Sequence, residues 1–197
     1  MEKAKQTNPD VSYLQTKSLS HTVRLVLCAL FAALTAALSQ LSIPLPSLVP
    51  INLATLSVFL AGGVLGAKLG LLSQAVYILL GAVGLPVFSN FNGGIHVLVG
   101  PTGGYIWGYA AAAWLVGLLA YRLAGRRGYW GLLVLSMVAG LAVCYTLGTI
   151  WFIVVTKSSL WAALWACVFP FLPGDALKII LAATLVPQLH KALRRAA

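Results

Sequence analysis

Six hydrophobic runs follow a polar start, and connections containing proline, glycine or basic residues separate them. A helix needs about 20 apolar residues to cross a bilayer, and most of these runs approach or exceed that length. The second and third runs are short and rich in glycine. The runs cover residues 21–41, 52–66, 69–85, 102–121, 129–155 and 174–190. The pattern predicts an all-α integral membrane protein with six transmembrane helices in one bundle.

The chain has two predicted parts, a polar segment and one transmembrane domain. Residues 1–20 contain no leading apolar core, which argues against a cleaved signal peptide. We therefore expect 1–20 to be a polar cytoplasmic segment and 21–197 to form the six-helix domain, with its first run retained as a span.

Basic residues are distributed unevenly around the runs. With a cytoplasmic N-terminus, only Lys157 lies in an outside connection. The residues on the inside are Lys3, Lys5, Lys17, Arg24, Lys68, Arg122, Arg126, Arg127, Lys191, Arg194 and Arg195. Because cytoplasmic connections carry an excess of Lys and Arg, the pattern predicts that both termini are cytoplasmic.

Three long, charge-poor connections then share the extracytoplasmic face: 41–50, 86–101 and 158–173. The last is too apolar for an aqueous loop, so we expect it to lie at the interface or to fold back into the bundle.

Composition supports a membrane protein and changes how the charge is interpreted. Of 197 residues, 60% are hydrophobic and 8% are charged, and the net charge is +10. A strongly basic chain suggests nucleic acid, but here the basic residues punctuate apolar runs and form no patch on a soluble domain. Membrane topology therefore explains the charge, and we expect no nucleic-acid partner.

Asp175 is the first candidate for chemistry, since it is the one acidic residue after Asp10. It falls in the first turn of the last predicted helix, where the helix dipole favours a negative charge. Lys178 follows one turn later and gains nothing from that dipole. The pair could be a self-neutralising bridge, as helices often form. However, ionisable residues within a membrane usually mark function, and this pair offers an anionic acceptor beside a cationic donor.

The second candidate is the stretch "PVFSNFNGGIHVLVGPTGGYIWGY", residues 86–109. Its glycines permit close backbone approach, Asn90 and Tyr105 supply neutral polar groups, and Phe88, Phe91 and Trp107 could supply apolar walls. It has no phosphate-loop pattern and no Lys or Arg. An ordinary connector with interfacial aromatics is the alternative.

The third candidate is a stripe of small residues in the first run, "CALFAALTAAL". Ala29 with Ala33, and Ala32 with Ala36, form flat faces at four-residue spacing that another helix could approach closely. The stripe could serve a partner protein or packing within the same bundle.

Other chemistries find little support. The three cysteines lie singly in apolar segments, and no histidine has a second ligand at metal spacing, so we expect no disulfide framework, metal or cofactor. One interior acid cannot form a catalytic carboxylate pair, and the serines lack an adjacent base. We therefore expect a protein that is not an enzyme.

The elements "GLPVFSNFNGG", "GPTGGYIWGY" and "PFLPGDALK", in this order, resemble the BioY family of biotin-specific S subunits of energy-coupling factor transporters. The resemblance covers roughly residue 25 to the C-terminus. It implies a six-helix membrane subunit without its own ATPase, in a bacterial-type inner membrane, that captures biotin from outside. The implied partners are biotin, the lipid bilayer, a transmembrane coupling protein and a pair of ATPases.

The resemblance also assigns residues. Asp175 and Lys178 match the polar pair in the family's last helix, and Asn90 matches an asparagine after the Pro-Val-Phe element. The stripe resembles the face that S subunits use for docking. The implied substrate-binding residues are Asn90, Tyr105, Asp175, Lys178, Phe88, Gly103 and Gly104. The implied docking residues are Ala29, Ala33, Ala32 and Ala36.

The sequence departs from the family pattern at one position and leaves two questions open. Members often have a glutamine where this chain has Ala54, and Asn52 is the nearby polar residue. Lys178 could attract the biotin carboxylate or only balance Asp175. An S-type subunit or small transporter for another vitamin-sized ligand is the alternative function.

Overall fold

The computed structural model describes residues 20–43 and 49–196 as a bundle of helices with two very short strands. The predicted N-terminal segment, apart from Ser20, lies outside the described residues. The elements are α1 (His21–Gln40), β1 (Ser42–Ile43), β2 (Ile51–Asn52), α2 (Ala54–Ala82), the 3-10 turn η3 (Ser89–Phe91), α3 (Ile95–Val99), α4 (Gly103–Arg122), α5 (Tyr129–Thr156), α6 (Leu160–Cys167) and α7 (Leu172–Ala196).

Five of the described helices are long and apolar enough to cross a membrane. They are α1, α2, α4, α5 and residues 172–193 of α7. The predicted helices 102–121 and 129–155 agree with α4 and α5 to within one residue at each end. These boundaries were predictable because glycine, proline or basic residues flank uniformly apolar runs.

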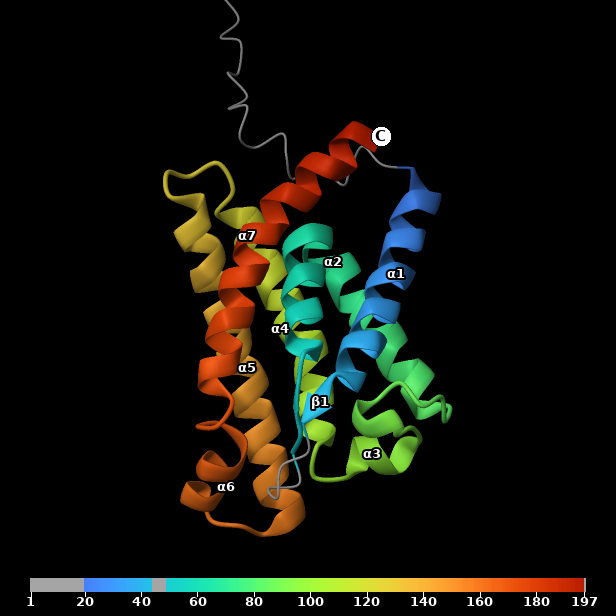
Figure 1. Cartoon of the computed structure of the whole chain (residues 1–197), viewed down its shortest axis with the longest axis vertical. Coiled ribbons are helices and arrows are strands. Elements are labelled where there is room, and N and C mark those ends of the chain that lie inside the picture. The colour runs from blue at the N-terminus through green and yellow to red at the C-terminus, as the bar shows by residue number, and fades with distance from the viewer. Residues whose placement is uncertain (1–19, 44–48, 197) are drawn as a thin grey trace, which may run out of the picture.

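The second and third predicted helices are joined in α2, which is interrupted at Gly66. Gly66 has φ 80° and ψ 179°, a conformation open essentially to glycine alone. A Cβ on Gly70 would lie 3.1 Å from the Cα of Gly62, although eight residues of straight helix span about 12 Å. The chain therefore reverses here, and we call residues 54–65 the first arm and 67–82 the second arm of α2 (Figure 1).

Helix α4 packs closely against the first arm of α2 and against α5. A Cβ on Gly62 would lie 2.5 Å from the carbonyl oxygen of Ala113, and one on Gly140 would lie 2.5 Å from a methyl group of Val116. Glycine is thus required for these helices to meet. Such contacts matter in a bilayer, where helices associate through packing rather than through the hydrophobic effect.

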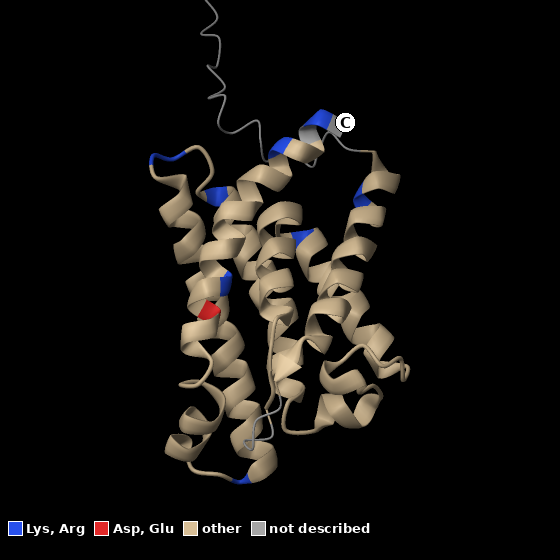
Figure 2. Ribbon diagram, viewed as in Figure 1, with Lys and Arg blue, Asp and Glu red and all other residues tan. Residues whose placement is uncertain are grey.

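The described parts of the long connections and their short elements lie toward the end of the bundle opposite the C-terminus (Figure 1). Strands β1 and β2 pair antiparallel there, with Ser42 opposite Asn52. Residues 44–48 of the predicted connection 41–50 lie outside the described residues. Helix α6, within the connector expected at the interface, packs Ala163 and Cys167 into the bundle and exposes Trp161 and Trp165. Lys and Arg gather at the C-terminal end (Figure 2). The two ends of the bundle therefore differ in charge as well as in structure.

Candidate functional site

A cavity of about 340 Å³ lies among residues of the helices and connections toward the end of the bundle opposite the C-terminus. Small-molecule pockets in proteins occupy about 300–1,000 Å³, so this one suits a compact ligand. Its wall is formed by the extended chain before α2, the connection between α2 and α4, and residues of α2, α4, α5, α6 and α7. The polar side chains on the wall include those of Asn52, Thr55, Asn90, Asn92, His96, Tyr105, Tyr109, Tyr145, Asp175 and Lys178.

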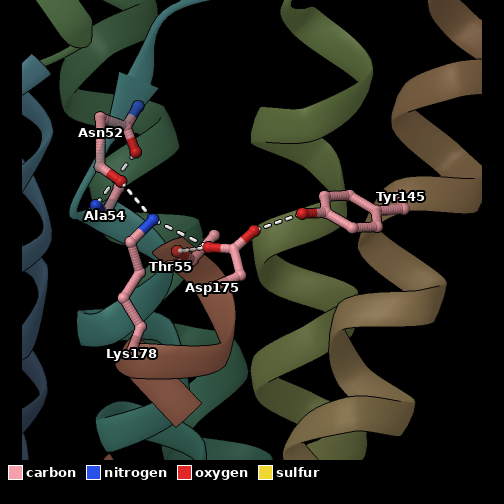
Figure 3. Close-up of polar contacts among 6 residues, drawn as sticks. All are labelled: Asn52, Ala54, Thr55, Tyr145, Asp175 and Lys178. Carbon is pink, nitrogen blue, oxygen red and sulfur yellow. Dashed lines mark hydrogen bonds and ion pairs between the residues drawn. The ribbon is translucent and has the colours of Figure 1, made fainter. Parts of the chain in front are cut away.

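Asp175 and Lys178 form a buried ion pair on this wall (Figure 3). The Lys178 Nζ lies 2.8 Å from the Asp175 Oδ1, and the two side chains are 6% and 2% exposed. An isolated charge buried this deeply would cost several kcal/mol, whereas a bonded pair offsets much of that penalty. The pair also lies in the first two turns of α7, where the dipole favours Asp175.

Three donors hold the Asp175 carboxylate in place (Figure 3). Lys178 and the Thr55 hydroxyl, the latter at 3.1 Å, donate to Oδ1. The Tyr145 hydroxyl donates to Oδ2. A carboxylate can accept about four hydrogen bonds, so the carboxylate keeps capacity for one more donor.

Lys178 has a second protein partner, since its Nζ also donates to the backbone carbonyl oxygen of Asn52 at 2.6 Å (Figure 3). An ammonium group has three N–H donors, so one remains after Asp175 and Asn52 are counted. The pair as a whole therefore presents one acceptor site and one donor site side by side. This arrangement suits a ligand group in which an N–H and a carbonyl are adjacent.

Asn52 connects three parts of the site. Its Oδ1 accepts a hydrogen bond from the Ala54 N–H at 3.0 Å, and its Nδ2 donates to the Ser89 hydroxyl at 2.7 Å. Ala54, the position at which the sequence departs from the pattern that it resembles, is fully buried. The neighbouring Thr55 supplies the hydroxyl on the first turn of α2 that reaches Asp175.

Phe88 and Asn90 both line the cavity. The Phe88 ring is 1% exposed and meets the Tyr77 ring edge-on, with centroids 5.5 Å apart. Asn90 is in the left-handed region at φ 60°, and its Oδ1 accepts a hydrogen bond from the Ser42 hydroxyl at 2.8 Å. Phe91 and Trp107 are 72% and 50% exposed and do not line the cavity, so the expectation that they form its walls is wrong.

Tyr105 lines the cavity from α4, and its hydroxyl lies 3.2 Å from the Thr149 hydroxyl. Gly103 and Gly104 are not among the lining residues. A Cβ on Gly103 would lie 1.9 Å from the Leu98 carbonyl oxygen, and one on Gly104 would lie 2.2 Å from the Trp151 Cβ. These two glycines therefore let the start of α4 pack against its neighbours.

The sequence reasoning did not single out Thr55, Tyr77, Tyr109, Tyr145 and Cys167 as site residues, although all five line the cavity. Their signal was weak because each is one hydroxyl or thiol inside a long apolar run. Tyr145 could have been found as a polar residue within a predicted span, where such groups need a partner. Burial raises the pKa of the Cys167 thiol, which keeps this part of the wall uncharged.

The alanine stripe on α1 separates into two faces. Ala32 is 1% exposed and Ala36 packs against the same core cluster, so both face the bundle. Ala29 and Ala33 are exposed on the other side. A docking role can therefore involve only Ala29 and Ala33 without a rearrangement of α1, because the other two side chains are covered.

A bundle of membrane-crossing helices with a solute-sized, partly polar cavity at one end defines a multi-pass membrane protein built to hold a small molecule. The family model described as BioY family matches residues 8–195. The chain therefore belongs to the BioY family.

Relatives and a solved structure agree with this assignment. The chain is 40% identical over 168 residues to the biotin transporter BioY of Thermotoga maritima, covering 85% of this chain and 96% of that protein. It is 38% identical over 164 residues to the biotin transporter BioY of Rhodobacter capsulatus, covering 78% and 86%. The crystal structure of the S-component for biotin from an ECF-type ABC transporter superposes with a TM-score of 0.78 at 31% identity, covering 86% of this chain and 92% of that one.

Proposed function

We propose that this protein takes up biotin by binding it in the cavity at the extracytoplasmic end of the bundle. Membership of the BioY family and the similarity to a biotin S-component support this function. The observation that carries the proposal is the buried Asp175–Lys178 pair on the cavity wall, since ionisable residues within a membrane usually mark a functional site.

The polar pattern of biotin suits this wall. Its ureido ring has two N–H donors beside a carbonyl, while its thioether ring and valeryl chain are apolar. We propose that Asp175 and Asn90 form hydrogen bonds with the ureido group, with Asp175 accepting from a ureido N–H. The ureido carbonyl can accept a hydrogen bond from Lys178. Phe88 and Tyr105 cover the apolar rings. Lys178 would thus bond to both Asp175 and the ligand. Two of its N–H groups donate to the Asn52 carbonyl and to Asp175, and these bonds fix the direction of the third N–H.

The proposed topology follows the charge distribution. Counting each arm of α2 as a span gives six transmembrane helices, with the N- and C-termini in the cytoplasm of a bacterial-type cell and the protein in its inner membrane. Arg126 and Arg127 precede the 28-residue α5 and Lys157 follows it, so the two connections lie at opposite ends of a spanning helix. The connection with more basic residues is the one expected in the cytoplasm, which supports this orientation. Uptake would be energised by a coupling transmembrane protein and ATPase subunits.

Binding of biotin to the purified chain, measured by titration calorimetry, tests the proposal. We expect Asp175→Asn and Lys178→Ala each to weaken binding by about 10- to 100-fold, because each removes charge-assisted hydrogen bonds to a buried partner. Near-normal affinity in both variants would contradict the proposed site. A panel of other labelled vitamins tests the alternative ligand class, and tighter binding of any of them than of biotin would overturn the assignment.

A further inference from the structure

The outer end of α1 holds the cavity segment 86–92 through two adjacent side chains. The Gln40 Nε2 donates to the Phe88 carbonyl oxygen at 3.1 Å and lies 3.3 Å from that of Pro86. The Ser39 hydroxyl lies 2.6 Å from the Val87 carbonyl oxygen and 2.7 Å from that of Ala36, and its one hydrogen can be donated to either. The carbonyls of three consecutive residues thus point toward the end of one helix.

Gln40 also accepts a hydrogen bond, so its amide binds the segment on both sides of the turn. The Phe91 N–H donates to the Gln40 Oε1 at 2.8 Å. Between these contacts the backbone folds tightly, and the Phe88 N–H donates to the Asn92 carbonyl oxygen at 2.9 Å. A single side chain therefore spans the turn that carries Asn90.

That turn needs external support because its backbone is strained. Asn90 and Phe91 have φ of 60° and 55°, and neither is a glycine. Consecutive residues in the left-handed region are unfavourable for L-amino acids and persist where the surroundings fix them. Gln40 supplies that constraint at the second strained residue, directly beside the one that lines the cavity.

We propose that Gln40 is a positioning residue for the ligand site: from the end of α1 it fixes the strained turn that places Phe88 and Asn90 on the cavity wall. It need not touch the ligand. The role in ligand affinity rests on the proposed function, whereas the role in holding the turn does not. A displacement of α1 would therefore move the turn that carries Phe88 and Asn90 and change the shape of the cavity.

Hydrogen–deuterium exchange of the ligand-free, full-length protein in detergent tests this role directly. Gln40→Met keeps the length and volume of the side chain and removes its hydrogen bonds, and Gln40→Ala serves as a second variant. We expect faster exchange in peptides covering 86–92, with exchange in α4 and α5 unchanged. Unchanged exchange at 86–92, or faster exchange throughout the bundle, would overturn the proposal.

Gln74→Ala is the matched control. Gln74 is a buried glutamine of α2 that bonds to α1 through the Thr35 hydroxyl at 3.2 Å, and its side-chain hydrogen bonds go to Thr35 and Ser73 rather than to 86–92. It should leave exchange at 86–92 unchanged.

Calorimetry with biotin gives the second readout. We expect Gln40→Met to weaken binding about ten-fold through loss of preorganisation. If the unmodified chain binds no biotin, the proposed function fails while the exchange result still decides the role of Gln40. If it binds biotin and Gln40→Met binds equally well, the positioning role is wrong.

Discussion

Asp175 is held by groups from three different helices, and each group restricts the direction in which the carboxylate can point. Lys178 comes from the same helix, Thr55 from α2 and Tyr145 from α5. The carboxylate is therefore preorganised before any ligand arrives, which reduces the entropy lost on binding. Tyr145 is the most informative residue of this set, because it is the donor to Oδ2.

Tyr145→Phe removes this donor and keeps the ring. We expect biotin affinity to fall about ten-fold, since Oδ2 loses the hydrogen bond that restricts its position. Thr146→Ala is the control, because the Thr146 hydroxyl is exposed and bonds only within α5, to the Ala142 carbonyl oxygen. Calorimetry on the three proteins gives the comparison, and equal affinities for Tyr145→Phe and the unmodified chain would show that Asp175 needs no third donor.

Among the elements, α2 is the one whose form depends most on a single residue. Gly66 lets the chain reverse, and the ring of Tyr121 lies against the position where a Cβ would stand, 3.1 Å away. The Tyr121 hydroxyl also donates to the Val64 carbonyl oxygen at 3.0 Å. The Val64 carbonyl near the end of the first arm thus has a partner on α4.

Gly66→Ala should lower stability by about 1–3 kcal/mol, because alanine is strained at this φ and its methyl group would press on Tyr121. In thermal unfolding in detergent we expect a Tm lower by on the order of 5 °C. Gly131→Ala is the control, since it lies in α5 with no atom within 4 Å of its would-be Cβ. A Tm for Gly66→Ala as high as that of the control would argue that the reversal tolerates a side chain.

The sequence predicted the long helices well and the surroundings of the site less well. Runs such as 129–155 are uniformly apolar and end at glycine or charge, so α5 was found almost to the residue. Strands β1 and β2 have two residues each, too few to show any period. Thr55 and Tyr145 were missed because their importance comes from Asp175, which is 120 and 30 residues away along the chain.

At the scale of the whole molecule, charge and structure divide the bundle into two unlike ends. Arg126 and Arg127 precede α5, and Lys157 follows it. A helix of 28 residues extends about 42 Å, enough to cross the hydrocarbon core with some tilt. Both connections should therefore be reachable from water, but from opposite sides of the membrane.

Labelling of an introduced, exposed cysteine in intact cells can test the orientation. Arg127 and Lys157 are both exposed, whereas the native cysteines are buried. We expect a membrane-impermeant maleimide to label Lys157→Cys in intact cells, and to label Arg127→Cys only after the cells are opened. The unmodified chain gives the background, and the reverse pattern would invert the proposed topology.

The exposed face of α1 leads to a prediction about the complete transporter. Ala29→Leu combined with Ala33→Leu should leave biotin binding unchanged, because neither residue lines the cavity. It should reduce partner-dependent uptake of labelled biotin by about ten-fold or more if α1 docks there, since small residues permit close helix approach. Val154→Trp, at a 67% exposed position on α5, is the control. Normal uptake by the double variant would argue against docking through α1.

The first arm of α2 has one more consequence. Its 12 residues rise about 18 Å, well short of the roughly 30 Å hydrocarbon core. The chain at residues 49–53, before the helix begins, is not helical. The Asn52 carbonyl therefore forms no bond within α2 and accepts a hydrogen bond from Lys178. The late start of α2 therefore places Asn52 in extended chain on the cavity wall rather than within a helix. A shift in where that helix begins could resize the site for a different solute while the rest of the scaffold stays as it is.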